Sequence, residues 1–160
     1  MLKKLYWVLL KLLTGFVVIS IAWVLLYRFV PVIYTPLMAI RSISDSRHLP
    51  PQKHWTAINR ISPHLITAVI AAEDQKFTSH HGFDIAAIKA ALASNRKAQG
   101  NLKGASTISQ QTAKNAFLWP GRDWLRKGLE AWLTVLIELL WSKQRIMEVY
   151  LNIIETGDGI

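Results

Sequence analysis

The sequence predicts a mostly α-helical protein with a single transmembrane helix at its N-terminus. Three observations lead to this expectation. A long apolar run fills residues 5–30, helix-capping residues recur along the rest of the chain, and no segment shows the alternation typical of a strand. We divide the 160 residues into a cytoplasmic N-terminus with a transmembrane anchor (1–30), a connector near the membrane (31–61) and a helical domain (62–160).

The apolar run is long enough to cross a bilayer as a helix. No residue from 12 to 27 is charged, and Lys11 is near enough to the end of the run to snorkel. Lysines precede the run, and aromatic residues lie toward both of its ends, so we expect the N-terminus in the cytoplasm and the domain on the outer face of the membrane. The alternative is a cleaved signal peptide, but apolar residues continue past Ser20-Ile21-Ala22, where its cleavage would occur.

Capping residues set the expected helices of the remaining chain. The prolines of the connector argue against a long helix there. Helices are expected over 63–76, 85–97, 108–118, 124–141 and 143–152, each after a Ser, Thr or Asp that can cap its first turn. The polar, basic segment 95–104 between two of them is expected to be a mobile loop. The glycine-rich end at 156–160 suggests a domain that is incomplete at its C-terminus.

Charge and composition narrow the class of partner. The net charge of +9 favours an anionic partner such as a phosphorylated substrate, an anionic lipid or nucleic acid. A domain outside the cytoplasm argues against nucleic acid. The chain has no cysteine, and its five histidines show no metal-ligand spacing, so we predict no protein-held metal site from His or Cys.

The densest group of polar residues lies at 68–84. An apolar helical run ends in two adjacent carboxylates, Glu73 and Asp74, and Phe77 and His80 follow closely. A carboxylate at the mouth of an apolar helix can act as a general base or acid. The alternative is a solvated acidic helix end followed by a turn.

A second dense segment, 105–118, suits a phosphate group. Ser106 and Thr107 begin a helix whose N-terminus would favour an anion, and Lys114 lies on the same helix. Alternatively, this is an ordinary capped polar helix. Further along, Arg126 and Glu130 are spaced as an ordinary i,i+4 ion pair.

Eight basic residues and one acid occur from 89 to 127, and carboxylates flank this stretch on both sides. Such a pattern suits a reaction on a phosphorylated sugar, in which a carboxylate moves a proton and cations hold a departing phosphate.

Four motifs occur together in one order: EDxxFxxHxGxD from Glu73, GxSTxxQQxxKN from Gly104, RKxxE from Arg126 and KxxIxExYLN from Lys143. Together they resemble the peptidoglycan glycosyltransferase family, which also forms the N-terminal half of bifunctional penicillin-binding proteins. With one anchor and no sign of a transpeptidase domain, the chain looks like a monofunctional member. The resemblance covers residues 68–160.

The resemblance implies a lysozyme-like helical glycosyltransferase domain with a smaller mobile lobe near the membrane, to which segment 95–104 would belong. It implies polymerisation of lipid II into glycan strands with release of undecaprenyl diphosphate, in bacterial cell-wall synthesis at the inner membrane. The partners implied are lipid II, the growing glycan strand, the membrane, and other cell-wall synthesis and division proteins.

Roles follow from the resemblance, residue by residue. Glu73 matches the general base, which deprotonates the acceptor's 4-hydroxyl for an inverting attack on C1 of the donor. Glu130 matches the second glutamate, which assists at the donor diphosphate, where a divalent cation (Mg²⁺ or Mn²⁺) is a possible cofactor. The remaining matches are diphosphate contacts, cleft-lining residues and residues that shape the site: Lys114 and Arg126; Ser106, Thr107, Gln111 and Asn115; Asp74, Phe77 and His80.

Two other functions fit part of the pattern. A lysozyme-like glycan-cleaving enzyme would also use paired carboxylates, although it has no diphosphate for the basic stretch to hold. A membrane-anchored scaffold for cell-wall synthesis would need neither glutamate for chemistry.

Overall fold

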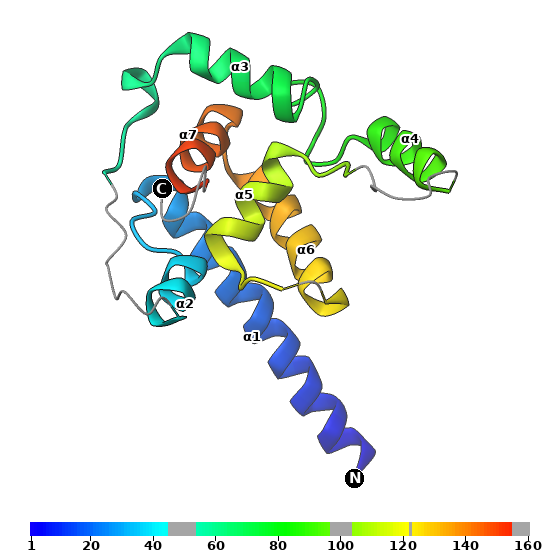
Figure 1. Cartoon of the computed structure of the whole chain (residues 1–160). Coiled ribbons are helices and arrows are strands. Elements are labelled where there is room, and N and C mark those ends of the chain that lie inside the picture. Colours follow the sequence, from blue (N-terminus) through cyan, green and yellow to red (C-terminus); the bar gives the residue numbers. More distant parts are fainter. Residues whose placement is uncertain (45–53, 97–103, 122, 155–160) are drawn as a thin grey trace.

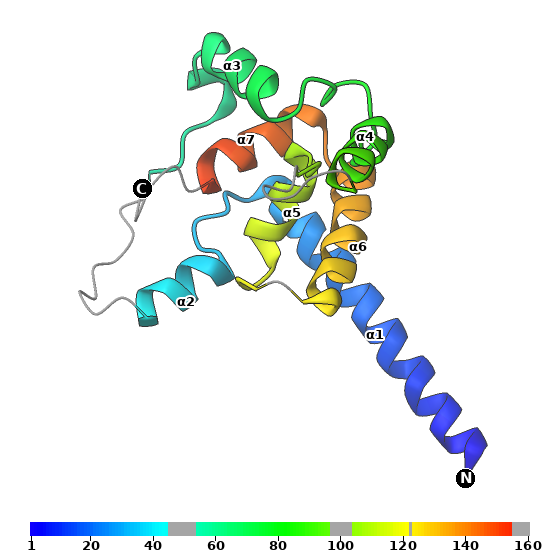
Figure 2. The ribbon, with the colours of Figure 1, turned by 45° about the vertical axis from the view of Figure 1, so that its right-hand side comes forward.

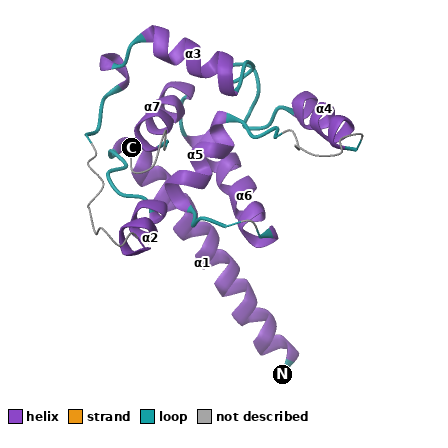
Figure 3. Cartoon of the chain, viewed as in Figure 1, coloured by secondary structure: helices purple, strands orange, loops and turns teal. Residues whose placement is uncertain are grey.

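The computed structural model describes residues 1–44, 54–96, 104–121 and 123–154. These residues form a long N-terminal helix that projects from a cluster of shorter helices (Figure 1). No strand is present among them (Figure 3), so the prediction of a mostly α-helical fold is confirmed. The elements are α1 (Leu2–Phe29), α2 (Pro36–Ser44), the 3-10 helix η1 (Ile58–Arg60), α3 (Pro63–Glu73), α4 (Ile85–Asn95), α5 (Ile108–Phe117), α6 (Trp124–Leu140) and α7 (Lys143–Ile153).

Helix α5 lies at the centre, in contact with both α6 and α7 (Figures 1 and 2). Eight of its residues are buried, although several of them are polar. The helix tolerates this burial because its polar groups are paired. Thr107 and Gln110 form the predicted capping box, and the Thr112 hydroxyl donates to the Ile108 carbonyl at 2.8 Å.

Helix α1 is joined to the domain along its C-terminal half. Trp132 Nε1 donates to Ser20 Oγ at 3.1 Å, and Trp141 Nε1 donates to the Val24 carbonyl at 2.8 Å. The Arg145 guanidinium donates to the Tyr27 carbonyl at 2.7 Å, and so satisfies a carbonyl of the last helical turn. By length and composition α1 can cross a membrane, as predicted, but its docking against α6 and α7 was not predicted from the sequence.

Helices α3 and α4 contribute no buried residue (Figure 1). The sequence pattern wrongly extended both. Helix α3 ends at Glu73 instead of near residue 76, because Asp74 leaves the helical conformation (φ −161°, ψ 79°) and its carboxylate caps another helix. Helix α4 ends at Asn95 instead of residue 97. The predicted mobile loop lies largely outside the described residues, as does the end at 156–160.

Four of the five predicted side-chain N-caps are confirmed, and the one before α3 is wrong, because the Ser62 side chain accepts no cap hydrogen bond. Asp84, Asp123 and Ser142 each accept a hydrogen bond from the backbone N–H three residues later. The Ala87 N–H is also the main reason that the pKa of Asp84 is lowered.

The connector contains a helix that the sequence analysis missed. Pro36 begins α2, a position at which proline is favoured, and Thr35 Oγ1 accepts from the Met38 N–H at 3.2 Å as a cap.

Candidate active site

Glu73 is the last residue of α3, and its side chain is exposed. Its Oε2 accepts a hydrogen bond at 2.9 Å from Nε2 of Gln111, a residue of the central helix α5. This carboxylate is therefore fixed from one side while it stays open to a bound molecule, which suits a group that must reach a substrate hydroxyl.

The neighbouring carboxylate, Asp74, has a different environment. It is buried, it accepts from the Ile108 N–H at 3.0 Å, and His80 Nε2 lies 2.9 Å from both of its oxygens. The Ile108 N–H belongs to the first turn of α5, where the helix dipole favours a negative charge. Asp74 thus ties the end of α3 to the start of α5, and both of its carboxylate oxygens are occupied by protein partners.

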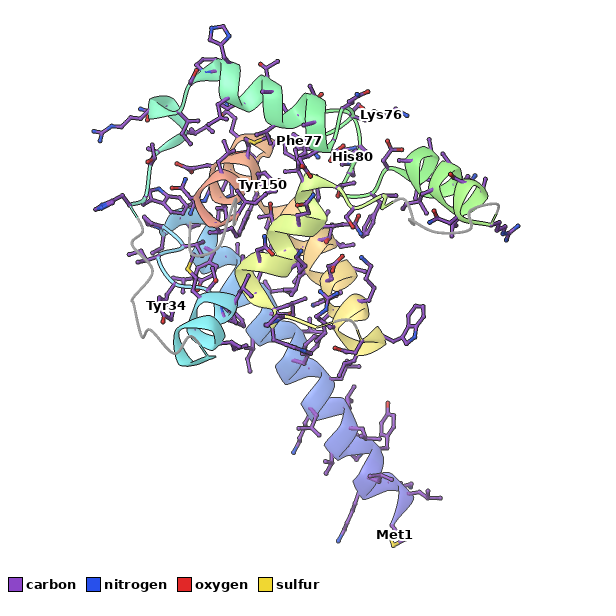
Figure 4. The ribbon with its side chains drawn as sticks, in the orientation of Figure 1. Met1, Tyr34, Lys76, Phe77, His80 and Tyr150 are labelled. Atoms are coloured by element: carbon purple, nitrogen blue, oxygen red, sulfur yellow. The ribbon has the colours of Figure 1, made fainter. Side chains whose placement is uncertain are left out.

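Asp74 and His80 belong to the segment 74–84, which we call the base loop. Gly82 N–H donates to His80 Nδ1 at 3.1 Å, so the ring proton sits on Nε2 and points to Asp74. Phe77 is buried beneath the loop, near His80 and α7 (Figure 4). Three residues were predicted to shape the site, and His80 contacts the other two, Asp74 and Phe77.

Position 82 disfavours any residue other than glycine. Its φ of +89° favours glycine, and an added Cβ would lie 2.8 Å from Cγ2 of Thr134 in α6. Its carbonyl accepts from the Thr107 hydroxyl at 2.6 Å. The base loop therefore lies directly against α6 and the start of α5. Thr107, predicted to line the cleft, uses its hydroxyl for this contact.

Glu73 lines the first of two pockets, which we call the base pocket. It has a volume of about 300 Å³ and lies between the end of α3, the start of α4 and the segment before α5. Its lining includes Glu73, Asp74, Lys76, Ser106 and Thr107. Ser106 and Glu73, which the sequence predicted to share a cleft, therefore do share one.

The second pocket, which we call the cation pocket, has a volume of about 330 Å³. It lies between α2, α5 and the start of α6, and its polar lining residues are Gln111, Lys114, Asn115 and Arg126. All four were predicted from the sequence to bind substrate. Leu37 of α2, which was not predicted, closes one side.

Arg126 is the most constrained cation of this pocket. It is only 8% exposed, and its NH1 donates to Glu130 Oε2 at 3.1 Å. Its Nε is buried and has no hydrogen-bond partner among the described residues. A buried guanidinium nitrogen without a partner is costly unless a ligand supplies an acceptor, so it indicates an anion site.

Glu130 is 3% exposed and accepts from two cations, Arg126 and Lys127. This confirms the i,i+4 spacing as an ion pair. It also bears on the predicted divalent cation. Both carboxylate oxygens are occupied, and the described residues contain no group of three metal-ligating side chains, so these residues do not fit a protein-held metal ion.

Gln111 connects the two pockets, because it lines the cation pocket and holds Glu73 of the base pocket. Tyr150, buried behind it in α7 (Figure 4), has its hydroxyl 3.5 Å from Gln111 Oε1. Burial, and then the charge of Glu73, raise the pKa of Tyr150 to about 12. The tyrosine therefore stays protonated beside the site.

Two residues near the base loop were missed as possible contributors to the site. Glu138 and Lys143 pair at 2.8 Å, and Lys143 also donates to the His80 carbonyl. Glu138 is the one acid in the apolar second half of α6. A lone carboxylate on an apolar helix face could have indicated from the sequence that this residue has a special role.

The sequence of this chain is similar to those of known proteins. The sequence pattern of the family described as Transglycosylase matches residues 41–160. A biosynthetic peptidoglycan transglycosylase of Bdellovibrio bacteriovorus is 55% identical over 91% of this chain and 59% of its own length. Those of Stutzerimonas stutzeri (54% identical) and Bacteroides thetaiotaomicron (55% identical) match 100% and 94% of this chain, and 67% and 61% of their own lengths. The chain thus spans about three-fifths to two-thirds of the length of these relatives.

Proposed function

The chain belongs to the transglycosylase family, and on that basis we propose that it is a peptidoglycan glycosyltransferase, which polymerises lipid II into glycan strands and releases undecaprenyl diphosphate. The observation that carries the proposal is the pairing of the two pockets. An exposed carboxylate lies in one, buried and basic side chains lie in the other, and Gln111 joins them.

Glu73 is the general base of the proposed reaction. It takes the proton of the acceptor's GlcNAc 4-hydroxyl as that oxygen attacks C1 of the donor MurNAc, with inversion at C1. The bond from Gln111 orients the carboxylate, and its exposure lets the acceptor reach it. Asp74 cannot share this role, because Ile108 and His80 occupy its oxygens.

The cation pocket is the site for the donor diphosphate. The bond from C1 to the diphosphate oxygen breaks, and the negative charge that develops on the leaving group is stabilised by Lys114 and Arg126. The unpaired Nε of Arg126 supplies a buried donor for a phosphate oxygen. Asn115 lines the same pocket and can donate from its amide.

Glu130 acts at the diphosphate through Arg126. Its carboxylate holds that guanidinium in place and balances its charge inside the protein. A divalent cation at the diphosphate stays a prediction. With Glu130 occupied by two cations, such an ion would depend mainly on phosphate oxygens, and we assign it no step.

Helix α1 is the proposed membrane anchor, with the N-terminus in the cytoplasm and the domain on the outer face of the bacterial inner membrane. This placement brings the domain to a lipid-linked substrate. Lipid II, the growing strand and other cell-wall synthesis and division proteins are the proposed partners.

Polymerisation of labelled lipid II in detergent tests the function, with the wild-type chain compared with Glu73→Gln. We expect polymer from the wild type and a loss of about 10²–10⁴-fold in the variant, the usual contribution of a positioned base. Shortening of preformed glycan in place of polymer would support the lytic alternative. Binding of cell-wall synthesis proteins with neither reaction would support the scaffold.

A further inference from the structure

We propose that Lys143 and Glu138 are positioning residues for the transfer reaction, which hold Glu73 in place through the base loop. The identity of the base rests on the function proposed above. Neither residue lines the base pocket or the cation pocket. They belong to a group of contacts that we call the Lys143 clamp: the side chains of Ser109, Glu138 and Lys143 and the carbonyl of His80.

The clamp joins three helices to the base loop. Lys143 Nζ, at the start of α7, donates to Glu138 Oε1 at 2.8 Å and to the His80 carbonyl at 2.7 Å. The same ammonium lies 4.6 Å from the centroid of the Phe77 ring, within the range of a cation–π contact. Ser109 of α5 donates to the same Oε1 of Glu138. Glu138 is the hub, and its side chain is only 7% exposed.

The base loop carries this restraint to Glu73. His80, whose carbonyl is held by Lys143, directs its imidazole to the Asp74 carboxylate. Asp74 is the residue that directly follows Glu73. Helix α3 reaches the core only through partly buried side chains (Ile66, Val69 and Ile70), so packing restrains its end less than it restrains a buried helix. The position of Glu73 thus depends in part on Asp74, which the Ile108 N–H and the clamped loop hold together.

Glu138 restrains the loop in a second way. An added Cβ at Gly82 would meet Glu138 Cγ at 3.1 Å, so the hydrocarbon part of this side chain forms part of the wall against which Gly82 lies. Gly82 N–H in turn fixes His80 through Nδ1. The carboxylate and the methylenes of one residue therefore restrain the same histidine, by its carbonyl and by its ring.

Stability alone does not account for a shielded ammonium–carboxylate pair. Replacing such a pair by apolar residues is often neutral or stabilising, whereas the pair can enforce one geometry. Every contact of this clamp that leaves α5, α6 and α7 ends in the base loop, on Phe77 or His80. The geometry points to a role in placing Glu73, the residue that directly precedes the base loop.

The test compares Lys143→Met, its matched control Lys143→Arg, and the double variant Glu138→Gln/Lys143→Met, in the full 160-residue chain in detergent. Kinetics of lipid II polymerisation give kcat and KM. NMR of ¹³C-labelled glutamate gives the chemical shift of the Glu73 carboxyl at one fixed pH, assigned by its loss in Glu73→Gln. The double variant removes both charges, so it separates loop placement from the effect of a carboxylate left without its cation.

We expect Lys143→Met to lower kcat about 10–100-fold with KM within about twofold, the size of effect caused by a displaced catalytic group. The double variant should fold more stably than Lys143→Met but keep the low kcat, because it still lacks the bond to His80. Lys143→Arg should recover most of kcat, since a guanidinium can donate to both acceptors. The Glu73 carboxyl resonance should move in the two variants that lack the cation, because the residue next to the loop changes its surroundings.

A wild-type kcat in folded Lys143→Met, with only a lower melting temperature, would overturn the proposal, as would a kcat that returns with stability in the double variant. If Lys143→Met does not fold, equal kcat in Lys143→Arg and the double variant would overturn it. If the 160-residue chain makes no polymer, the same variants are compared in a chain extended to the length of its relatives, and no polymer from that longer chain would put the proposed function at fault. The Glu73 resonance then decides for the clamp, which an unchanged chemical shift would overturn.

Discussion

The two pockets are built in opposite ways. In the base pocket, Glu73 is exposed at the end of a helix that buries no residue, and hydrogen bonds hold it in place. At the cation pocket, the lining residue Arg126 and its partner Glu130 are both buried side chains of α6. A base must meet a hydroxyl that arrives with each acceptor, whereas a diphosphate site must hold cations in advance. The difference matches the two tasks that we propose for these pockets.

The largest effect should separate the two glutamates. Glu73→Gln should cost about 10²–10⁴-fold in kcat, yet change the free energy of unfolding by less than about 0.5 kcal/mol, because the side chain is exposed. Glu130→Gln should cost about 3 kcal/mol of stability, because it leaves a buried guanidinium without its counterion. Denaturant unfolding and polymerisation assays together check this. Equal loss of stability in both variants would contradict the contrast between an exposed Glu73 and a buried, ion-paired Glu130.

Next in size is the loss of the buried cation. Arg126→Met should lower kcat/KM about 10²–10³-fold, as expected when a group that stabilises a leaving anion is removed. Arg126→Lys, which keeps the charge but lacks the planar fork, should recover only part of this. Steady-state kinetics at several donor concentrations measure both. Full activity in Arg126→Met would show that the diphosphate does not bind in the cation pocket.

On the base side, Gly82→Ala should destabilise the protein by about 1–3 kcal/mol, because alanine is strained at φ +89° and its Cβ would press on Thr134. The variant should also lose activity, since the displaced loop carries Asp74. Gly128→Ala, where a Cβ meets nothing within 4 Å, is the matched control. Thermal unfolding of both variants checks the prediction, and equal melting temperatures would contradict it.

The smallest effect concerns alkaline stability. The pKa of Tyr150 is raised from 10.0 to about 12 in the folded protein. Unfolded protein therefore loses this proton first, and the stability that Tyr150 contributes is present below pH 10 and is lost as the pH rises toward 12. Tyr150→Phe should lose less stability than the wild type over this interval. Melting temperatures at pH 8, 10 and 11 measure it, and parallel curves would contradict it.

Local signals accounted for most of the fold. Caps at Asp84, Thr107, Asp123 and Ser142 placed the helix starts, because a cap depends on residues within one turn. The end of α3 was missed because Asp74 caps α5, a partner 34 residues away, in preference to continuing its own helix. Contacts across such distances leave no periodic trace in the sequence.

In the candidate site, too, the sequence predicted some features and missed others. Motif matching named the polar residues of the cation pocket, and the structure brings them together. It could not show that Asp74 is buried beside an exposed Glu73, since the two are adjacent and chemically alike. It also missed Leu37, whose helix was hidden in a connector that was read from its prolines alone.

The docking of α1 against the domain affects how deeply the protein would lie in a membrane. Residues 2–14 of α1 are exposed and free of the domain, a length of about 20 Å at 1.5 Å per residue, whereas a hydrocarbon layer is about 30 Å thick. For α1 to span a bilayer, the layer must therefore also surround the stretch where α1 meets α6. The two helices run in the same direction there, since Phe16 lies beside Trp132 and Val24 beside Trp141.

In that arrangement the start of α6 would enter the lipid leaflet nearest the domain, and its first residues, Trp124 and Leu125, are 92% and 70% exposed. Figures 1 and 2 show this end of α6 beside the middle of α1. Arg126 follows directly, so the cation pocket would open close to the plane of the lipid phosphates. An enzyme seated at that depth meets a lipid diphosphate by sideways diffusion within the membrane, without lifting it into water.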